Sequence, residues 1–317
     1  MKKELGTFIL LVLLCVVLAI LNPSFLAGVN LQNLARLIGI YGIFSIGLGI
    51  VIITGGIDLS VGSVFALLGV LLSIFLTEWH LPAAIAVIAV VAITTLLGAI
   101  NGFLITKVKI QPFIVTLCGL LFYRGLARFV ANDETKGFGA AEGFEGLKNL
   151  ATGDLFGIPT PFIILILISI VMWIVLHRSI YGRYLFAVGR NETAARYSGI
   201  NSDLIVASAY VLSGFLAGIA GILLAFYTNS ISPSSHGNFY ELYGIAAAVL
   251  GGCSLRGGEG SIVGILIGTA LLQVLQNLVN LLGIPSSLNF AVMGAVILIG
   301  VLADQLLRQR QAAKVIK

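Results

Sequence analysis

Two glycine-rich stretches hold the residues of this 317-residue chain that are best placed to do chemistry in an apolar environment. Residues 54–63 read Thr-Gly-Gly-Ile-Asp-Leu-Ser-Val-Gly-Ser, and residues 251–261 read Gly-Gly-Cys-Ser-Leu-Arg-Gly-Gly-Glu-Gly-Ser. Both run Gly-Gly-x-x-Leu, then Gly-Ser and a new apolar run, so the two look related. Glycine lets the backbone leave a helix, which a membrane tolerates only where protein or water satisfies the freed groups. We predict helix breaks at seven glycines: Gly55, Gly56, Gly62, Gly251, Gly252, Gly257 and Gly258.

The first stretch also carries a carboxylate and a hydroxyl. Asp58 has the most apolar flanks of any acidic residue in the chain, and an acid embedded in a membrane is a functional candidate by default. We therefore consider Asp58 and Ser60 as candidates for lining a translocation pathway. The alternative is that Asp58 caps the helix that begins near Leu59 or Ser60, at a cytoplasmic turn. The two roles are not exclusive, and both stay open.

Residues 260–282 show two different helix faces. Four amide side chains share one face at i, i+3, i+4 and i+7 spacing: Gln273, Gln276, Asn277 and Asn280. Three glycines recur at every fourth position on a roughly opposite face, suited to close helix contact: Gly260, Gly264 and Gly268. Neutral amides suit an uncharged, hydroxyl-rich solute better than an ion, so this face is a second candidate for the pathway. Hydrogen bonding of the amides to neighbouring helices is the alternative.

A polar segment at 178–203 predicts a short surface helix at 191–198. Asn191 is a good N-cap, and Glu192 in the first turn complements the helix dipole. Gly199 suits the C′ position. Two alanines, Ala194 and Ala195, would give this helix a flat side. A helix of about eight residues is marginal alone in water, so it needs a brace or a docked partner. An ordinary connecting loop is the alternative.

Motifs for catalysis and cofactor binding are absent from the sequence. It has no Gly-x-x-x-x-Gly-Lys-Ser/Thr, so the chain itself should hold no nucleotide on a P-loop. It has no His-Glu-x-x-His or Gly-x-Ser-x-Gly. The three cysteines are odd in number and lie in apolar stretches, and the three histidines are far apart. We therefore expect no enzyme activity, no bound metal and no cofactor in this chain.

The composition defines the elements that must position these residues. Hydrophobic residues make up 59% of the chain and charged residues 10%, against roughly 25% charged in a soluble domain. The mean hydropathy is +1.09. A water-soluble fold of this size needs far more charge to cover its surface. The composition therefore predicts a lipid-embedded protein and excludes a soluble enzyme, a nucleic-acid binder and a disordered chain.

Apolar runs of roughly the 20 residues that a crossing helix needs recur along the chain. We predict ten spans, of which the third and eighth are short: 5–21, 37–53, 61–76, 82–106, 112–130, 161–177, 204–228, 242–255, 262–282 and 286–302. The runs lack alternation, which argues against a β-barrel. The first run follows Lys2 and Lys3 but has no cleavage site, so we interpret it as a retained anchor. We predict an all-α polytopic membrane protein, with residues 1–317 forming one domain.

Basic residues give the orientation of these spans. With the N-terminus inside, thirteen Lys and Arg fall on the cytoplasmic side: Lys2, Lys3, Lys107, Lys109, Arg178, Arg183, Arg190, Arg196, Arg256, Arg308, Arg310, Lys314 and Lys317. Five fall outside: Arg36, Arg124, Arg128, Lys136 and Lys148. By the positive-inside rule, both termini and the 178–203 segment are predicted to be cytoplasmic, and the 131–160 loop external.

Three of these segments together resemble a known family. Residues 56–63 read Gly-Ile-Asp-Leu-Ser-Val-Gly-Ser. Residues 182–201 contain Gly-Arg-Tyr, Ala-Val-Gly, Asn-Glu, Ala-Ala-Arg and Ser-Gly-Ile-Asn. Residues 241–260 contain Glu-Leu, Ile-Ala-Ala, Val-Leu-Gly-Gly, Ser-Leu and Gly-Gly-x-Gly. In order and spacing, from about residue 20 to 305, they resemble the membrane permease of ribose-type monosaccharide ABC importers.

The resemblance implies a homodimer in the bacterial cytoplasmic membrane that imports a monosaccharide, with ribose as the best single guess. It implies an ATP-binding subunit inside, which would hold ATP and Mg²⁺, and an extracytoplasmic sugar-binding protein outside. It also implies that the short surface helix is the coupling helix seated in the ATPase. The coupling residues would be Asn191, Glu192, Ala194, Ala195, Arg196, Gly199 and Ile200. No role for nucleic acid is implied.

The chain departs from the family pattern at two places. Arg190 stands where the family usually has Gly, which adds charge at the ATPase contact. Tyr243-Gly244 stands where the family tends to have Asp-Ala. An ion-coupled secondary sugar transporter would share the spans, the polar face and the broken helices, and is the alternative function. A membrane-embedded enzyme would need clustered acids or histidines, which the sequence does not show.

Overall fold

The fold is given by a computed structural model, which describes residues 2–139, 143–285 and six positions between 288 and 298. The tenth predicted span, 286–302, is thus almost wholly outside the described residues, and the basic residues after it are outside entirely. The described part is mostly helical. It includes one small antiparallel hairpin, β1 (Asp154–Leu155) and β2 (Ile158–Pro159), directly before the helix that begins at Thr160.

Seven helices in the described ranges are long and apolar enough to cross a membrane. They are α1 (Lys2–Leu21), α2 (Gly28–Ile53), α4 (Ala83–Thr106), α5 (Pro112–Val130), α7 (Thr160–His177), α10 (Ser202–Thr228) and α12 (Ile262–Leu281). Two apolar helices are shorter, α3 (Val61–Thr77) and α11 (Tyr240–Leu250). These are the third and eighth predicted spans. The eighth was predicted to reach residue 255, but α11 ends at Leu250, because glycines follow it.

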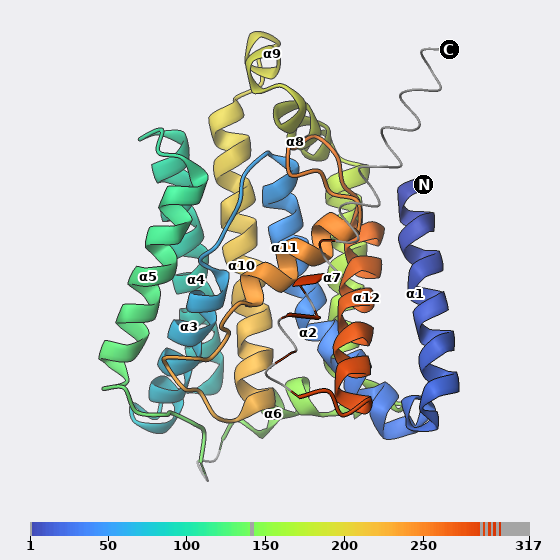
Figure 1. Cartoon of the computed structure of the whole chain (residues 1–317). Helices are drawn as coiled ribbons and strands as arrows, with labels where there is room; N and C mark the ends of the chain where they lie inside the picture. The colour runs from blue at the N-terminus through green and yellow to red at the C-terminus, as the bar shows by residue number, and fades with distance from the viewer. Residues whose placement is uncertain are drawn as a thin grey trace.

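Short helices mark the two ends of the bundle (Figure 1). α8 (Ile180–Arg190) and α9 (Glu192–Tyr197) lie at one end, which we call the α9 end. α6 (Glu145–Thr152) lies at the opposite end, called the α6 end, and a 3-10 turn, η1 (Pro23–Leu26), joins α1 to α2. The chain starts at the α9 end. The described helices fit the all-α polytopic membrane protein that the composition predicted.

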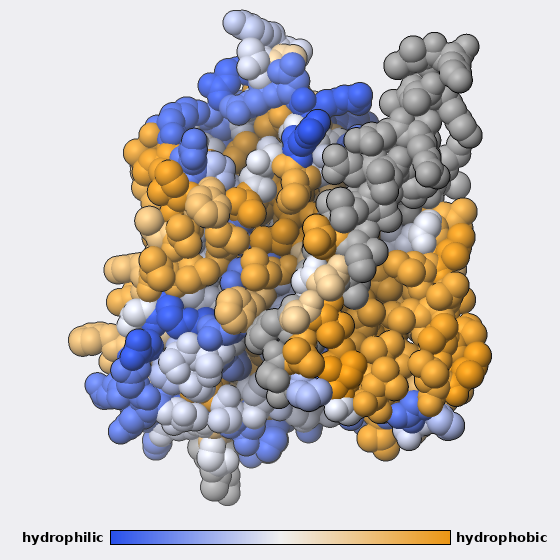
Figure 2. All heavy atoms as spheres, in the orientation of Figure 1, coloured by the Kyte–Doolittle hydropathy of each residue, from blue (hydrophilic) through white to orange (hydrophobic). Residues whose placement is uncertain are grey.

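The centre of the bundle is formed by α2 and α10. In their most apolar stretches, 83% and 78% of the residues are buried, against 22% for α4 and 6% for α1. The outer helices expose mainly Leu, Ile, Val and Phe, as a lipid-facing surface requires. Figure 2 shows this surface as an apolar belt, with hydrophilic residues gathered at both ends of the molecule.

The two short helices belong to crossings that are broken inside the bundle. Residues 54–60 leave the end of α2 without helical structure, and α3 begins only at Val61. Residues 229–239 leave the end of α10, and α11 begins only at Tyr240. The segment before α11 packs on the first turn of α3, because a Cβ atom on Gly237 would lie 2.6 Å from the carbonyl oxygen of Gly62. A Cβ atom on Gly62 would in turn overlap the carboxylate of Glu241, in the first turn of α11.

The first helix packs on the side of the bundle and is held at both of its ends. Near its start, the Thr7 hydroxyl donates to the Leu250 carbonyl at 2.8 Å, and Glu4 accepts a hydrogen bond from the Ser261 hydroxyl. Past its other end, the Asn22 amide donates to the Leu281 carbonyl at 2.9 Å. α1 is therefore anchored mainly against α12 and the segment before it.

Candidate functional site

The two glycine-rich stretches meet at the α9 end, where they also touch the end of α8. The amide of Gly258 donates to the Ile53 carbonyl, the last residue of α2, at 2.8 Å. A Cβ atom on Gly257 would lie 2.6 Å from the Gly189 carbonyl oxygen and 2.9 Å from the Gly55 amide nitrogen. We call Gly55, Gly189, Gly257 and Gly258 the glycine junction. The backbones of these segments are in direct contact there, with no side chain between them. A displacement of α8 would therefore be transmitted directly to the neighbouring segments.

The glycine junction requires glycine for its backbone angles as well as for its close contacts. Gly55 and Gly257 both have φ of +82°, and Gly258 has φ of +74°, a region that other residues rarely adopt. A Cβ atom on Gly258 would also lie 2.8 Å from the Cα of Arg190. Arg190, where the chain departs from the family pattern, is therefore packed by its backbone against the junction.

The other predicted break glycines have separate contacts. A Cβ atom on Gly56 would lie 2.6 Å from the Tyr210 hydroxyl, and one on Gly62 would overlap the Glu241 carboxylate. Gly251 ends α11 and packs against the first turn of α12, and Gly252 follows it with φ of +98°. Neither glycine-rich stretch is helical between the helices that flank it.

The predicted surface helix is present as α9. The Asn191 side chain caps it, because its Oδ1 accepts a hydrogen bond from the Ala194 amide at 2.9 Å. Gly199 follows the helix with φ of +82°. The Ile200 amide then donates back to the Ala195 carbonyl at 3.1 Å, which closes the turn.

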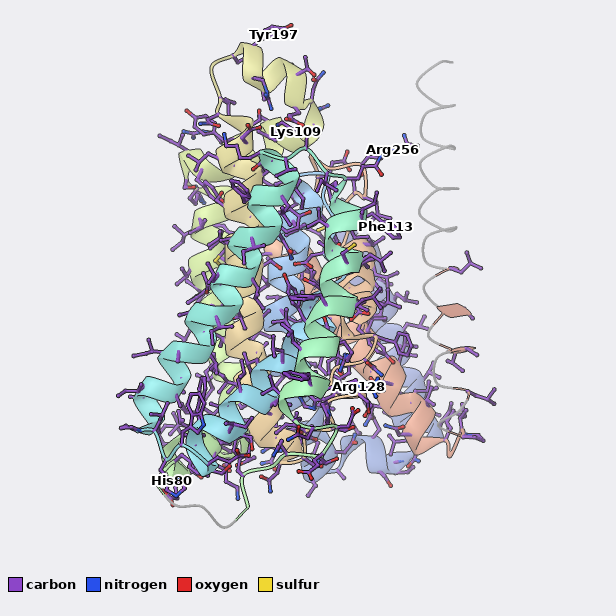
Figure 3. The ribbon with its side chains drawn as sticks, turned by 90° about the vertical axis from the view of Figure 1, so that its left-hand side faces the viewer. His80, Lys109, Phe113, Arg128, Tyr197 and Arg256 are labelled. Atoms are coloured by element: carbon purple, nitrogen blue, oxygen red, sulfur yellow. The ribbon has the colours of Figure 1, made fainter. Side chains whose placement is uncertain are left out.

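The faces of α9 are not those that the sequence alone suggested. Asn191, Glu192, Ala194 and Arg196 are exposed. Ala195 is buried against the chain's own helices and Ile200 is half-buried, so these two brace α9. Tyr197, which sequence reasoning did not select, is 89% exposed at the tip of the molecule (Figure 3). It lies two residues after the buried Ala195, about 200° around the helix, and no signal in the sequence alone shows which of these two residues faces outward.

Sequence analysis also missed α8 as a helix. The Ser179 hydroxyl caps it by accepting a hydrogen bond from the Gly182 amide at 3.1 Å. Leu185 and Val188 are buried one turn apart, so α8 lies on the bundle rather than free of it. α8 runs from the end of α7 to the glycine junction and leads directly into α9.

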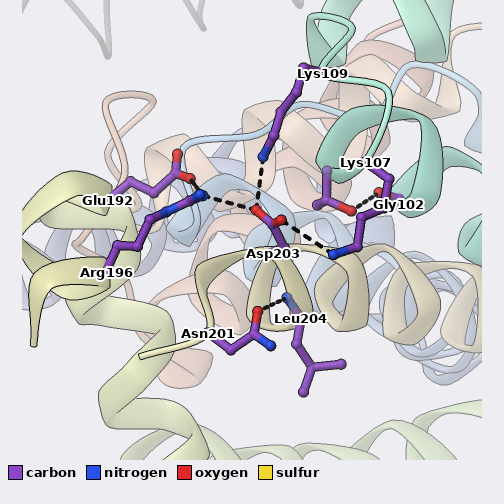
Figure 4. Close-up of polar contacts among 9 residues, drawn as sticks. Gly102, Lys107, Lys109, Glu192, Arg196, Asn201, Asp203 and Leu204 are labelled. Atoms are coloured by element: carbon purple, nitrogen blue, oxygen red, sulfur yellow. Dashed lines mark hydrogen bonds and ion pairs between the residues drawn. The ribbon is translucent and has the colours of Figure 1, made fainter. Parts of the chain in front are cut away.

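A cluster of charges ties α9 to two transmembrane helices (Figure 4). Asp203, in the first turn of α10, binds the Lys109 ammonium at 2.8 Å, the Lys107 ammonium at 3.4 Å and the Arg196 guanidinium at 2.9 Å. Arg196 also pairs with Glu192 at 2.7 Å. These five residues form what we call the Asp203 cluster.

The Asp203 cluster is a mechanical link as well as an ion-pair network. The hydrogen bond from Arg196 to Glu192 and the charge of Asp203 raise the pKa of Arg196 above its usual value. The cluster joins α9 to the turn between α4 and α5 and to the start of α10. Nothing in the local sequence could have paired Lys107 with a residue 96 positions away.

Asp58 and Ser60 belong to a buried polar core. The Asp58 carboxylate accepts from the Ser60 hydroxyl at 2.6 Å and from the Ser60 amide at 2.9 Å. Asn101 donates to the Ser60 hydroxyl at 3.2 Å, and Tyr123 donates to the Asn101 side-chain oxygen at 3.3 Å. Ser213 donates to the second Asp58 oxygen at 3.5 Å. We call these five residues the polar core.

The polar core binds together helices rather than opening onto a surface. Asp58 is 3% exposed and Ser60 is 1% exposed. The chain of hydrogen bonds joins four segments: Ser213 of α10 bonds Asp58 directly, Asn101 of α4 bonds Ser60, and Tyr123 of α5 bonds Asn101. α3 begins at Val61 without a side-chain cap, so the bond from the Ser60 amide to Asp58 holds the turn before the helix and does not cap it.

The amide face of α12 contacts a different part of the bundle. Asn277 exchanges two side-chain hydrogen bonds with Asn30 of α2, at 2.7 and 3.1 Å. Gln273 is buried, Gln276 is half-buried and Asn280 is exposed. On the opposite face, Gly264 and Gly268 pack against the backbone of α11. The amides and the polar core therefore have different partner helices, so the two sets of predicted pathway residues do not form one cluster.

Candidate metal ligands do not gather anywhere in the described residues. No group of three or more His, Cys, Asp or Glu side chains that could hold a metal ion occurs among them. The three cysteines are free, with Cys253 buried and Cys118 exposed on α5. What the described geometry offers is a set of linked helix ends, which suits conformational transmission rather than bond chemistry.

Comparisons with known proteins show which family the chain is similar to. Residues 30–301 match the family model described as the branched-chain amino acid transport system / permease component. The chain is 42% identical to the ribose import permease protein RbsC of Bacillus subtilis, over 96% of this chain and 93% of the relative. It is 40% identical to RbsC of Escherichia coli K12, over 95% and 93%. It is 31% identical to the D-allose transport system permease protein AlsC of the same strain, over 95% and 91%.

No solved structure gives a significant match to the chain. The resemblance to ribose-type permeases that the three motifs suggested is nevertheless confirmed by relatives that span almost the whole sequence. These relatives are transport components rather than enzymes, in line with the motifs that the sequence lacks. On the strength of the family match and of these identities, the chain belongs to the family of transport-system permease components.

Proposed function

We propose that this chain is the membrane permease of an ATP-driven, binding-protein-dependent importer of a monosaccharide, with ribose as the first candidate. The observation that carries the proposal is the 42% identity to a ribose import permease over 93% of that protein's length. The chain is a transport component, not an enzyme, and a multi-pass protein of the bacterial cytoplasmic membrane.

Ten spans with both termini in the cytoplasm form part of the proposal. Nine of the predicted spans correspond to described helices, two of them short. Basic residues assigned to the inside lie at the α9 end, among them Lys109 and Arg256, whereas Arg128 and His80 lie toward the α6 end (Figure 3). The α9 end is then cytoplasmic by the positive-inside rule, and the α6 end faces outward.

The partner at the cytoplasmic face is a separate ATP-binding subunit, which carries the ATP and Mg²⁺. Its docking point is α9, through the exposed Asn191, Glu192, Ala194 and Arg196 and the exposed ring of Tyr197. Movement of α9 has two routes into the membrane. One is the Asp203 cluster, which leads to α4, α5 and α10, and the other is α8, which leads to the glycine junction and hence to α2 and α12.

The same two routes support an alternating-access cycle. An extracytoplasmic binding protein delivers the sugar at the α6 end, and closure of the ATPase draws the α9 helices of two copies of the chain together. The ends of α2 and α12 follow through the glycine junction, because backbone-to-backbone contact there leaves no slack. Asn191, Gly199 and Ile200 fix the shape of α9, and Ala195 fixes its seat.

Reconstitution in vesicles tests this function. The chain is purified with its genetic neighbours, incorporated into liposomes, and supplied with labelled ribose and binding protein outside and ATP inside. We expect uptake that requires ATP and stays unchanged when ionophores collapse ion gradients. Uptake by the chain alone that follows an ion gradient would instead establish the secondary transporter. Replacement of Tyr197 by Ala should release the ATPase in a pull-down, with Phe129→Ala, an 80% exposed aromatic residue at the α6 end of α5, as the control.

A further inference from the structure

Residues 229–239 re-enter the bundle from the α6 end and reach about the middle of the membrane. α10 has 27 residues and so crosses the whole bilayer, ending at Thr228. From there the chain returns to Gly237, which packs on Gly62 in the first turn of α3. α3 extends from Gly62 to its outer end at Thr77, a length of about 22 Å. The segment 229–239 is therefore re-entrant.

Both ends of the re-entrant segment are fixed. At the outer side, Ile231 and Lys136 exchange two backbone hydrogen bonds, at 2.7 and 3.0 Å. Deeper in, the Arg124 guanidinium donates to the carbonyls of His236 at 2.7 Å, Pro233 at 3.1 Å and Gly62 at 3.2 Å. These bonds occupy the guanidinium and lock the curve of the segment onto α5 and α3.

Four side chains of the re-entrant segment face outward from the subunit. Ser234, Ser235, Asn238 and Phe239 are all exposed, although they lie beside the bundle at membrane depth. In Figure 2, hydrophilic residues on the left rise from the α6 end into the apolar belt. Irregular backbone and polar side chains at this depth are stable only against protein or water, never against lipid. The surface of the re-entrant segment therefore cannot be part of the lipid-facing belt.

We propose that Ser234, Ser235, Asn238 and Phe239 line the outer half of a water-filled sugar path, closed on its far side by a second copy of this chain. The inference rests on the proposed function for the cargo. The residues have the chemistry for a neutral polyhydroxylated ligand, because hydroxyl and amide groups exchange hydrogen bonds with sugar hydroxyls. Phe239 adds a flat apolar surface for the C–H face of a sugar ring.

The backbone at Phe239 supports this assignment. Its φ is +66°, in the left-handed region that a bulky aromatic residue rarely adopts. Such strain persists only where the surroundings fix it, and it collects at functional sites. Here it places the Phe239 side chain, 47% exposed, directly before the first turn of α11. The proposed path therefore passes the place where α3 and α11 begin, and not the amide face of α12.

Single cysteines test whether the re-entrant segment faces water. Ser234→Cys, Ser235→Cys and Asn238→Cys are made in the full transporter, and a membrane-impermeant thiol reagent is added from outside. Labelling is read for each peptide by mass spectrometry, so the three natural cysteines do not interfere. Ile88→Cys on α4, 68% exposed to the apolar belt in the same outer half, is the control. We expect about tenfold faster reaction or more at the three positions, because only a hydrated thiol ionises.

The outcomes separate the path from its alternatives. Fast labelling that slows when sugar-loaded binding protein is added supports the proposal. Fast labelling that the sugar never alters would show a hydrated surface that carries no cargo, and labelling as slow as at Ile88→Cys would show a dry contact, with the second copy or with the chain's own last predicted span. Either result overturns the proposal. ATP-driven uptake by the wild type tests the function independently of these rates.

Phe239 provides a second readout. Phe239→Ala should reduce uptake at limiting sugar by about fivefold, as the loss of one aromatic contact implies, while Phe239→Tyr retains it. ATPase activity stimulated by the binding protein should stay intact in both variants. Equal uptake in Phe239→Ala and the wild type would remove Phe239 from the path.

Discussion

The two broken crossings of this protein differ in where their polar side chains lie, buried in one and exposed in the other. In the first, residues 54–60 bury Asp58 and Ser60, and the Asp58 carboxylate accepts hydrogen bonds from Ser60 and from Ser213 of α10. In the second, residues 229–239 satisfy their backbone through Arg124 but leave hydroxyl and amide side chains exposed. A break whose side chains are all paired internally stabilises the bundle. A break that leaves them exposed is available to a ligand.

We therefore expect residues 54–60 to determine the stability of the fold and residues 229–239 to determine transport. Substitutions in the inward-facing break should lower the unfolding temperature, with loss of transport following from it. Substitutions in the outward-facing break should change transport in a fully stable protein.

Gly257→Ala should have the largest effect. A Cβ atom there meets the Gly189 carbonyl oxygen at 2.6 Å, and φ of +82° strains any other residue. We expect a loss of more than about 3 kcal/mol of stability, measured as detergent-solubilised unfolding, and loss of coupled ATPase activity. Gly125→Ala on α5, which would meet nothing within 4 Å, is the matched control. A stable, active Gly257→Ala protein would show that the glycine junction is not tight.

Asp58→Ala should come next, because it leaves the hydroxyl and amide of Ser60 and the hydroxyl of Ser213 without their acceptor. Unpaired buried donors cost about 1–3 kcal/mol each, so the unfolding temperature should fall clearly. Asp58→Asn should recover part of the loss. Ser234→Ala in the re-entrant segment is the contrasting variant and should unfold like the wild type. If Ser234→Ala is as destabilised as Asp58→Ala, the distinction between the two breaks is wrong.

Asp203→Asn should uncouple the subunits without unfolding the chain. It removes the shared partner of Lys107, Lys109 and Arg196, but these groups are partly exposed, so the stability cost is about 1 kcal/mol or less. The quantity to measure is sugar moved per ATP hydrolysed, which should fall several-fold. Arg128→Gln, which breaks a pair with Asp133 toward the α6 end, should leave this ratio unchanged. Equal ratios in the two variants would exclude the cluster from coupling.

The smallest effect is expected at Asn277. Asn277→Leu breaks its reciprocal pair with Asn30, and such bonds between membrane helices contribute about 0.6 kcal/mol on average. The double variant Asn30→Leu/Asn277→Leu should regain most of the stability, because neither side then has an unpaired amide. Transport rates should not change. A strong transport defect in the double variant would return the amide face of α12 to the pathway.

Sequence alone located the elements well where the signal is local. The 112–130 span coincides with α5, and the 191–198 helix differs from α9 by one residue at each end, because apolar runs and the Asn191 cap define them. α8 was missed because its buried face is short. Tyr197 was passed over because only the buried position of Ala195 shows which way α9 faces.

The relations between distant residues could not be predicted. Gly258 was predicted as a helix break, but its contacts with Ile53 and with the end of α8 appear only in the structure. Asp203 is an ordinary helix-start acid until three basic side chains surround it. Residues 229–239 read as a polar external loop. Their depth follows from the length of α11, which at 11 residues is too short to cross a bilayer alone.

The position of α1 has a consequence for how the protein is made. Its Thr7 hydroxyl bonds to a residue 243 positions later, and the partner helix α12 is synthesised later still. At bacterial translation rates of about 5–20 residues per second, α1 waits roughly 10–50 s in the membrane before that partner emerges. Its nearly uniform apolar surface, with 6% of its most apolar stretch buried even in the finished protein, lets it wait in lipid without a chaperone.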